Sequence, residues 1–325
     1  MKECIMVVDF GTSNARTNLV DITDGSIVTG HSKQVFYHSP KTDFHEIPAD
    51  DYWLASVETT QRVIEEAGSR YHIAGLVFSY IGDSLVPVDA KGNPTYPMLA
   101  SYDLRAKNDM ELYTEQLGTR EFEKISGCPL TPRNTGVKIH WLKKYMPDVA
   151  ERTAQYLTLQ QYVNLRLGLG PVSDYSVANR KLMLDVRTKK WSARLLDLIG
   201  SNTEEMGTVI TGGDECIGKI TYYGPVKLPY EIPVFPGGVY RSRTGQQYPW
   251  DSRQRGRYIR PLRISEVRVP RHLACSRNPD GGRTDKGQLC YDQSTSGRKR
   301  LAVVYTSDRR KERHETSRRL FQVGS

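Results

Sequence analysis

The stretch Met6–Arg16 reads MVVDFGTSNAR, and it decides the fold predicted for this chain. The run Cys4–Val8 is short, apolar and rich in β-branched residues, which is typical of a buried strand and too short for a helix. Asp9 ends the run, and Gly11 lets the backbone come close to a ligand where a side chain would block it. The chain then returns to an extended pattern, so the stretch predicts a β-hairpin.

The predicted tip of this hairpin carries groups that suit phosphate. Thr12 and Ser13 place hydroxyls there, and the guanidinium fork of Arg16 matches phosphate oxygens. Asp9 stands at the base, where its carboxylate would orient a hydrated Mg²⁺. The alternative is an ordinary hairpin turn with no ligand.

Further segments extend the hairpin into an α/β pattern. Ile27–Tyr37 continues the extended run, which predicts a three-stranded antiparallel meander. A helix is predicted to begin after Pro48 and to end at Gly68. His72–Ser79 has a fully apolar centre, as expected of a strand inside a sheet covered on both faces. Helices are predicted at Thr135–Tyr145 and Ala150–Leu167, strand character at Arg180–Val186 and Ile217–Ile220, and a helix at Trp191–Ile199.

Charge divides the chain near residue 238. The 325 residues contain 46 Lys and Arg and 37 Asp and Glu. Residues 239–325 hold 21 of these basic residues and 8 of the acidic ones, a net charge of +13, whereas residues 1–238 carry a net −4. After Gly238 no helical or strand period is sustained beyond short extended runs such as Leu301–Tyr305. We therefore predict a folded domain at 1–238 and an arginine-rich tail at 239–325, which is disordered or comes from a shifted reading frame.

The cysteines predict a reducing, cytoplasmic location. The five cysteines form no Cys-x-x-Cys pair and no regular framework, so free thiols are expected. The apolar start is too short for a signal peptide, and no run approaches the ~18 apolar residues of a membrane span.

Three charged residues are candidates for contact with a polar substrate. Asp83 follows the predicted buried strand, and ligands of α/β sheets gather at the carboxyl ends of such strands. Asp103 and Arg105 stand two residues apart before a predicted helix. The alternatives are a solvated turn acid at Asp83 and a helix N-cap acid with a nearby counter-charge at Asp103.

Several of these motifs resemble one protein family. Asp9–Ser13, DFGTS, is similar to the first phosphate motif of the sugar-kinase, actin and heat-shock ATPase superfamily. Thr135–Leu142, TGVKIHWL, resembles a helix ending in Lys-x-x-Trp-Leu, and Asp174–Ala178, DYSVA, resembles an Asp-x-Ser-x-Ala segment of the FGGY carbohydrate kinases. The resemblance implies a ribonuclease H-like (actin-like ATPase) α/β domain, with a mixed sheet flanked by helices.

The resemblance also implies an activity, which is ATP-dependent phosphorylation of a hydroxyl on a small sugar or polyol, with Mg²⁺ as the metal. It implies that the phosphates face Gly11, Thr12, Ser13 and Arg16, and that the metal shell is held by Asp9. The sugar would be met by Asp83, Asp103 and Arg105. Two departures leave the sugar open, because Gly82 lies where several members have Arg and Ser101 replaces a family Trp.

The match ends just before the family's general base. That Asp falls at Tyr240 here, and a phenol with a pKa near 10 is a poor base at neutral pH, so no catalytic residue is assigned. The family's second, ATP-binding domain has no counterpart in the sequence pattern that follows. We therefore expect a truncated kinase with little or no turnover. The alternatives are a non-catalytic sugar-binding remnant and non-specific nucleic-acid binding through residues 239–325.

Overall fold

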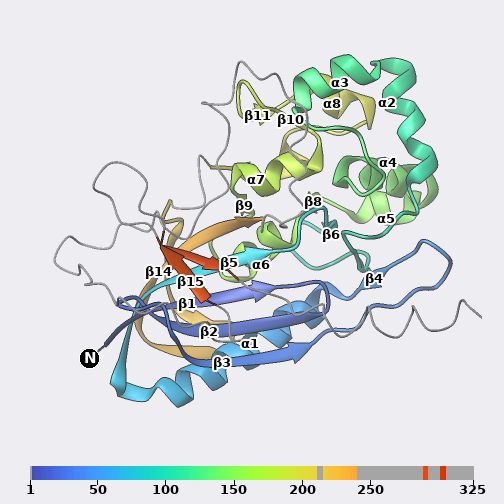
Figure 1. The fold of residues 1–325 in the computed structure, drawn as a ribbon. Coiled ribbons are helices and arrows are strands. Elements are labelled where there is room, and N and C mark those ends of the chain that lie inside the picture. Colours follow the sequence, from blue (N-terminus) through green and yellow to red (C-terminus); the bar gives the residue numbers. More distant parts are fainter. Residues whose placement is uncertain (1, 211–214, 240–287, 292–300, 305–325) are drawn as a thin grey trace, which may run out of the picture. The chain divides into compact units, whose positions relative to one another are not determined.

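The computed structural model describes residues 2–210, 215–239, 288–291 and 301–304 (Figure 1). Within residues 2–239, the main sheet has six strands in the order β13-β14-β5-β1-β2-β3. Their bounds are β1 Lys2–Phe10, β2 Asn14–Asp21, β3 Ile27–Gln34, β5 Tyr71–Tyr80, β13 Gly218–Tyr223 and β14 Val226–Val239. The neighbours β1, β5 and β14 run parallel, whereas the β1–β2, β2–β3 and β13–β14 pairs are antiparallel. The sheet is therefore mixed, as predicted.

The first hairpin and the meander are confirmed. The β1–β2 register runs from Cys4 opposite Asp21 to Phe10 opposite Ala15. Strand β3 then pairs with β2 on its other side. A tight turn at residues 11–13 joins the first two strands, so the polar residues of the DFGTS motif lie at the sheet edge.

Helix α1, Ala49–Ala67, packs on the sheet against β1, β2 and β3. It begins after Pro48 and ends at Gly68, as predicted. Met6 and Val8 belong to the core that contains Trp53 of this helix, and the alternate residues Ile5 and Val7 are also buried. Both faces of β1 are therefore covered. Among the residues that the structure describes, no helix combines the length and apolar character needed to cross a membrane.

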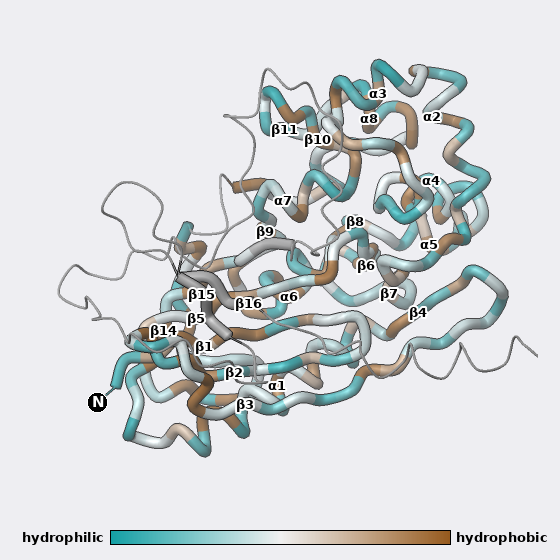
Figure 2. The backbone as a smooth tube through the Cα atoms, in the orientation of Figure 1, coloured by the Kyte–Doolittle hydropathy of each residue, from teal (hydrophilic) through white to brown (hydrophobic). Residues whose placement is uncertain are grey.

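A mainly helical lobe lies between β5 and β14 in the sequence. Its helices are η2 Lys107–Met110, α2 Glu111–Gln116, α3 Thr119–Ser126, α4 Thr135–Tyr145, α5 Pro147–Arg152, α6 Leu159–Arg166, α7 Tyr175–Ala178, η3 Asn179–Lys181, α8 Ala193–Leu198 and η4 Glu204–Met206, and its short strands are β6 Val86–Val88, β7 Met98–Leu99, β8 Gln155–Leu157, β9 Val172–Ser173, β10 Leu184–Asp185, β11 Lys190–Trp191 and β12 Thr208–Val209. Strand β4, Glu46–Ile47, pairs with β7, and the short helix η1, Gly68–Arg70, follows α1. The lobe has its own buried core, which includes Tyr113, Phe122 and Leu142. Helices α2 and α3 are mostly hydrophilic in colour, as expected of an outer layer (Figure 2).

Two predicted elements of the lobe are wrong in detail. The single helix predicted at Ala150–Leu167 is interrupted by β8, which pairs with β6. Thr158 then starts α6 with a capping box that it forms with Gln161. The strand predicted at Arg180–Val186 is shorter, because Arg180 lies in η3 and only β10 is extended.

The remaining described strands pair with each other. β15, Gln288–Tyr291, pairs antiparallel with β16, Leu301–Val304, in agreement with the extended run noted there. These strands belong to a second compact unit, whereas the main sheet and the lobe belong to the first. The predicted boundary at residue 238 stays a prediction. The disorder, the shifted reading frame and the nucleic-acid binding predicted for 239–325 concern residues that lie almost entirely outside the described ones.

Candidate active site

The predicted site begins where β1 and β5 end. These strands are parallel neighbours, with Asp9 beside Ser79 and Phe10 beside Tyr80. The amide of Ile81 donates to the carbonyl of Phe10 at 3.0 Å, so the chain leaves both strands at the same edge. The DFGTS turn and the turn that carries Asp83 therefore start from adjacent points, as expected for a ligand site at the carboxyl edge of a sheet.

The tip of the first hairpin is held from below by α1. The Gly11 amide donates to the Asn14 carbonyl at 2.9 Å, which closes the turn. The hydroxyl of Tyr52 on α1 donates to the carbonyls of Gly11 and Thr12 at 2.9 and 3.2 Å. Both carbonyls are thus engaged by α1, while Thr12 and Ser13 are exposed. The turn presents its hydroxyls to solvent, as a phosphate-facing tip requires.

Asp9 and Arg16 meet each other across the hairpin. Arg16 Nη1 lies 3.4 Å from Asp9 Oδ2 in the β1–β2 register. Burial raises the pKa of the Asp9 carboxyl, although its hydrogen bond with Ser79 and the Arg16 charge oppose this. A cation at Asp9 would favour the ionised carboxylate. Because Mg²⁺ usually takes one or two carboxylates together with substrate phosphates, the Asp9 carboxylate fits that ion. Among the described residues, no group of three or more His, Cys, Asp or Glu side chains offers a ready-made metal site.

Asp83 is buried and paired, which the sequence did not predict. It adopts a left-handed backbone conformation with φ of 59° just after β5. Arg180 Nη2 lies 2.6 Å from Asp83 Oδ2, and Asn134 Nδ2 donates to Asp83 Oδ1 at 3.4 Å. The predicted alternative of a solvated turn acid is therefore wrong, since the Asp83 side chain is only 7% exposed.

Asp103 and Arg105 form a closed network. Arg105 donates from Nε and Nη2 to both carboxylate oxygens of Asp103, and from Nη2 to Glu46 Oε1 at 2.8 Å. The Arg105 guanidinium stacks over the Phe44 ring, 3.9 Å from its centroid. The amide of His45 donates to Asp103 at 2.6 Å. Both side chains are fully enclosed, so in this structure they position the segment between residues 100 and 105, and a direct contact with sugar stays a prediction.

Two other residues tie the predicted segments together. Lys138 on α4 is fully buried, and its ammonium donates to the carbonyls of Asp83 at 2.7 Å and of Ala100 at 2.6 Å. Burial lowers the pKa of Lys138 to about 8, against the opposing effect of nearby carboxylates. Tyr102 reaches the Thr12 carbonyl at 3.5 Å. The structure thus brings the hairpin tip, the Asp83 turn and the 100–105 segment into one region.

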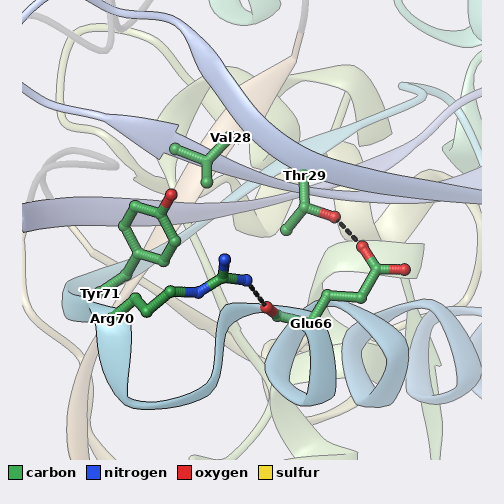
Figure 3. Close-up of a pocket in the computed structure, with 5 residues that line it drawn as sticks. All are labelled: Val28, Thr29, Glu66, Arg70 and Tyr71. Atoms are coloured by element: carbon green, nitrogen blue, oxygen red, sulfur yellow. Dashed lines mark hydrogen bonds between the residues drawn. The ribbon is translucent and has the colours of Figure 1, made fainter.

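A pocket elsewhere on the sheet contains none of these residues. It is lined by Val28, Thr29, Glu66, Arg70 and Tyr71, at β3 and the end of α1 (Figure 3). Thr29 donates to the Glu66 carboxylate, and Arg70 Nη2 donates to the Glu66 carbonyl at 2.7 Å. Hydrogen bonds from Thr29 and then His31 lower the pKa of Glu66. Thr29, Glu66 and Arg70 of this pocket therefore form hydrogen bonds with one another.

Comparison with known proteins decides the family. The sequence model for the N-terminal domain of the FGGY family of carbohydrate kinases matches residues 4–241. The chain belongs to the FGGY family. The resemblance inferred from DFGTS, TGVKIHWL and DYSVA is therefore confirmed.

The similar proteins are named as kinases of different small compounds. The chain is 28% identical over 238 residues to the xylulose kinase of Lactococcus lactis. This alignment covers 72% of the chain and 47% of the relative. It is 26% identical over 208 residues to the glycerol kinase of Bacillus velezensis, covering 62% and 42%. The gluconate kinase of Lactobacillus acidophilus superposes with a TM-score of 0.67 at 19% identity, over 74% of this chain and 48% of that one. The superposition shows the shared fold, and the chain spans about half the length of the curated relatives it matches.

The end of β14 leads toward the family's general-base position. Gln160 donates to the carbonyls of Pro236 and Gly237 at 3.0 and 3.3 Å and to Asp174 Oδ2 at 2.8 Å. Gly237 has φ of 66°, and a Cβ there would lie 1.7 Å from the Phe78 carbonyl oxygen, so only glycine fits. Position 240 itself lies outside the described residues, and its role stays a prediction.

The partners that fix these site residues have no local signal in the sequence. Glu46, Asn134 and Arg180 are far in sequence from the acids or bases they contact, and no local pattern marks them. Lys138 was part of a recognised motif, but the motif did not reveal what its ammonium holds.

Proposed function

We propose that residues 4–241 supply the sugar site and the phosphate-facing hairpin of an ATP-dependent carbohydrate kinase. The observation that carries this proposal is the Ile81–Phe10 hydrogen bond at the shared edge of β1 and β5. Because of it, the exposed DFGTS turn and the Asp83 turn start from one place, as transfer between two substrates requires. The activity of the whole kinase is part of the proposal, since the matched relatives are about twice as long as the matched segment.

On the phosphate side, Gly11, Thr12 and Ser13 would bind phosphate oxygens through the exposed turn, and Arg16 would add positive charge. Asp9 would hold a water-rich Mg²⁺ shell. When bound, Mg²⁺ neutralises charge on the phosphates during in-line transfer. The Asp9–Arg16 pair keeps both groups at the base of the turn before nucleotide arrives.

On the sugar side, Asp83 would accept hydrogen bonds from hydroxyl groups of the substrate. Asp103 and Arg105 would act from the neighbouring segment, whose position Lys138 fixes relative to the Asp83 turn. The substrate would be a small sugar or polyol, as for relatives named for xylulose, gluconate and glycerol. A cytoplasmic location also belongs to this proposal, on the ground that Cys128 and Cys216 are free thiols.

The 325-residue chain is expected to bind sugar with little turnover, because Tyr240 replaces an acid as the group that would accept the hydroxyl proton. Calorimetry with D-xylulose, D-gluconate and glycerol, in the presence of Mg²⁺ and ATP, tests the binding. A coupled assay for sugar-dependent ADP release tests the turnover. We expect heat with at least one sugar and a rate far below the ~1 per second typical of slow kinases.

The variant Asp83→Asn should reduce the affinity for sugar measured by calorimetry. The control Asp148→Asn, which changes an exposed acid of α5, should leave that affinity unchanged. Sugar-dependent ADP release at about 1 per second or faster would overturn the low-turnover proposal. Absence of heat with all three compounds would overturn the sugar site.

A further inference from the structure

The Asp83 turn combines backbone strain with a buried ion pair. An Asp at φ of 59° is uncommon, although Asp tolerates this region better than most residues, and such outliers cluster at ligand sites. Its partner Arg180 comes from a position 97 residues later in the sequence. The carboxylate is 7% exposed and the Arg180 side chain 31% exposed, so the pair is sheltered but open on the arginine side.

The segment that delivers Arg180 is anchored on both sides. Before it, Asn179 Nδ2 donates to Cys128 Sγ at 3.2 Å. After it, the fully buried ammonium of Lys181 donates to the carbonyls of Tyr156 at 2.6 Å and Met206 at 2.8 Å. With its neighbours held in this way, the backbone of Arg180 has little freedom. The guanidinium is therefore presented to Asp83 in a preorganised position.

The acid is held just as firmly. Asn134 donates to Asp83 Oδ1, and its own side-chain oxygen accepts from the Thr131 amide at 2.9 Å. The ammonium of Lys138 donates to the Asp83 carbonyl. Gly82, next to the acid, contributes no side chain, and Arg180 supplies a cation that reaches the Asp83 carboxylate directly. Burial of an ion pair adds little net stability, because the desolvation of both charges offsets their attraction. Stability by itself therefore does not explain the Asp83–Arg180 pair.

We propose that Arg180 is a specificity-determining residue of the sugar site and that, with Asp83, it binds two adjacent hydroxyls of the substrate. This inference rests on the proposed carbohydrate kinase function. A carboxylate only accepts hydrogen bonds and a guanidinium only donates them, whereas a hydroxyl does both. One hydroxyl of the pair donates to Asp83, and its neighbour accepts from Arg180. The guanidinium carries five N–H donors, and the bond from Nη2 to Asp83 uses one of them.

This arrangement selects a chemical class. A sugar or polyol with a vicinal pair of free hydroxyls satisfies both charged groups at once. A substrate that lacks one hydroxyl of the pair loses a hydrogen bond to a charged group and should bind more weakly. A substrate carboxylate at the same place would meet the negative charge of Asp83.

The test is calorimetry on the 325-residue chain with D-xylulose, D-gluconate and glycerol, followed by the monodeoxy analogues of the compound that binds best. The variants are Arg180→Ala and Arg180→Lys. The matched control is Arg187→Ala, which removes an exposed arginine of the same lobe whose guanidinium bonds the Lys124 carbonyl. Arg180→Ala should weaken binding by roughly tenfold or more, as expected when a hydrogen bond to a charged group is lost. Arg180→Lys should restore part of the affinity, and Arg187→Ala should leave it unchanged.

The analogues separate specificity from simple support of the fold. One monodeoxy compound should bind at least roughly tenfold more weakly than its parent to the unaltered chain, yet Arg180→Ala should weaken it no further. Equal weakening of the parent and all analogues would show a structural role and overturn the inference. Unchanged binding in Arg180→Ala would also overturn it, while the proposed function would stand.

Two further outcomes are decisive. If the unaltered chain binds none of the three compounds, the proposed function fails and the inference fails with it. If circular dichroism shows that Arg180→Ala does not fold, binding to Arg180→Lys tests the inference instead. A lysine variant that binds parent and analogues as the unaltered chain does would overturn the inference, and one that has lost the discrimination between them would support it.

Discussion

The hairpin tip and the lobe handle polarity in opposite ways. At the tip, Thr12 and Ser13 are exposed, and the turn offers hydroxyls to solvent. In the lobe, Asp103, Arg105 and Lys138 are fully buried, and each is bonded within the protein. The hydroxyls at the tip are therefore accessible to a ligand, whereas the charged groups of the lobe hold segments of the protein in place.

This difference teaches where mutations should act. An exposed group in water contributes little to stability but is available to a ligand, whereas a buried charge that loses its partner is left unsolvated. Changes in the lobe should therefore first lower the free energy of unfolding. Changes at the tip should leave that quantity alone and affect only ligand binding.

The largest expected effect is at Arg105. Arg105→Met leaves the carboxylates of Asp103 and Glu46 without their cation in an enclosed site. The free energy of unfolding should fall by about 3–5 kcal/mol, measured by urea denaturation. The control Arg194→Ala breaks the exposed pair with Glu121 and should cost less than about 1 kcal/mol. Similar losses in the two variants would overturn the expected contrast between buried and exposed charges.

A smaller effect is expected from the titration of Lys138. Its pKa of about 8 in the folded chain lies below the value of 10.5 for an exposed lysine. Between these values the unfolded chain binds a proton that the folded chain does not, so the contribution of Lys138 to stability rises with pH. From pH 7 to pH 9 this amounts to about 1 kcal/mol.

The charged neighbours of Lys138 are Asp83, Asp103, Arg105 and Arg133, and other groups of the chain titrate in the same range. The comparison is therefore made with Lys138→Met, using urea denaturation at both pH values. The unaltered chain should gain the stated stability relative to that variant. An equal response of the two proteins to pH would show that the buried ammonium does not titrate there.

The smallest effect on stability is expected at the tip. Ser13→Ala removes an exposed hydroxyl, and the urea midpoint should not change measurably. The affinity for ATP with Mg²⁺, measured by calorimetry, should fall by roughly tenfold, because a hydrogen bond to a charged oxygen is lost. A clear loss of stability with unchanged nucleotide binding would mean that the turn is structural, as in the ordinary-hairpin alternative.

Local patterns predicted the sheet better than the lobe. The hairpin, α1, β5 and α4 were confirmed because each has a complete local signal, such as an apolar strand core or a Pro and Gly at the helix ends. The predicted helix at Ala150–Leu167 was wrong because its apolar spacing continues across residues 155–157. Those residues become a strand only through pairing with β6, which lies about 70 residues earlier.

The sequence by itself determined the hairpin, the polar residues at its tip and membership of the FGGY family, since these depend on residues that are neighbours in the chain. It also named Asp83, Asp103 and Arg105. Only the tertiary structure decided how those charges are used. Their partners Arg180, Glu46 and Lys138 come from distant segments. Whether a charge is solvated or buried against a counter-charge depends on what folding brings beside it, and no local period in the sequence records that.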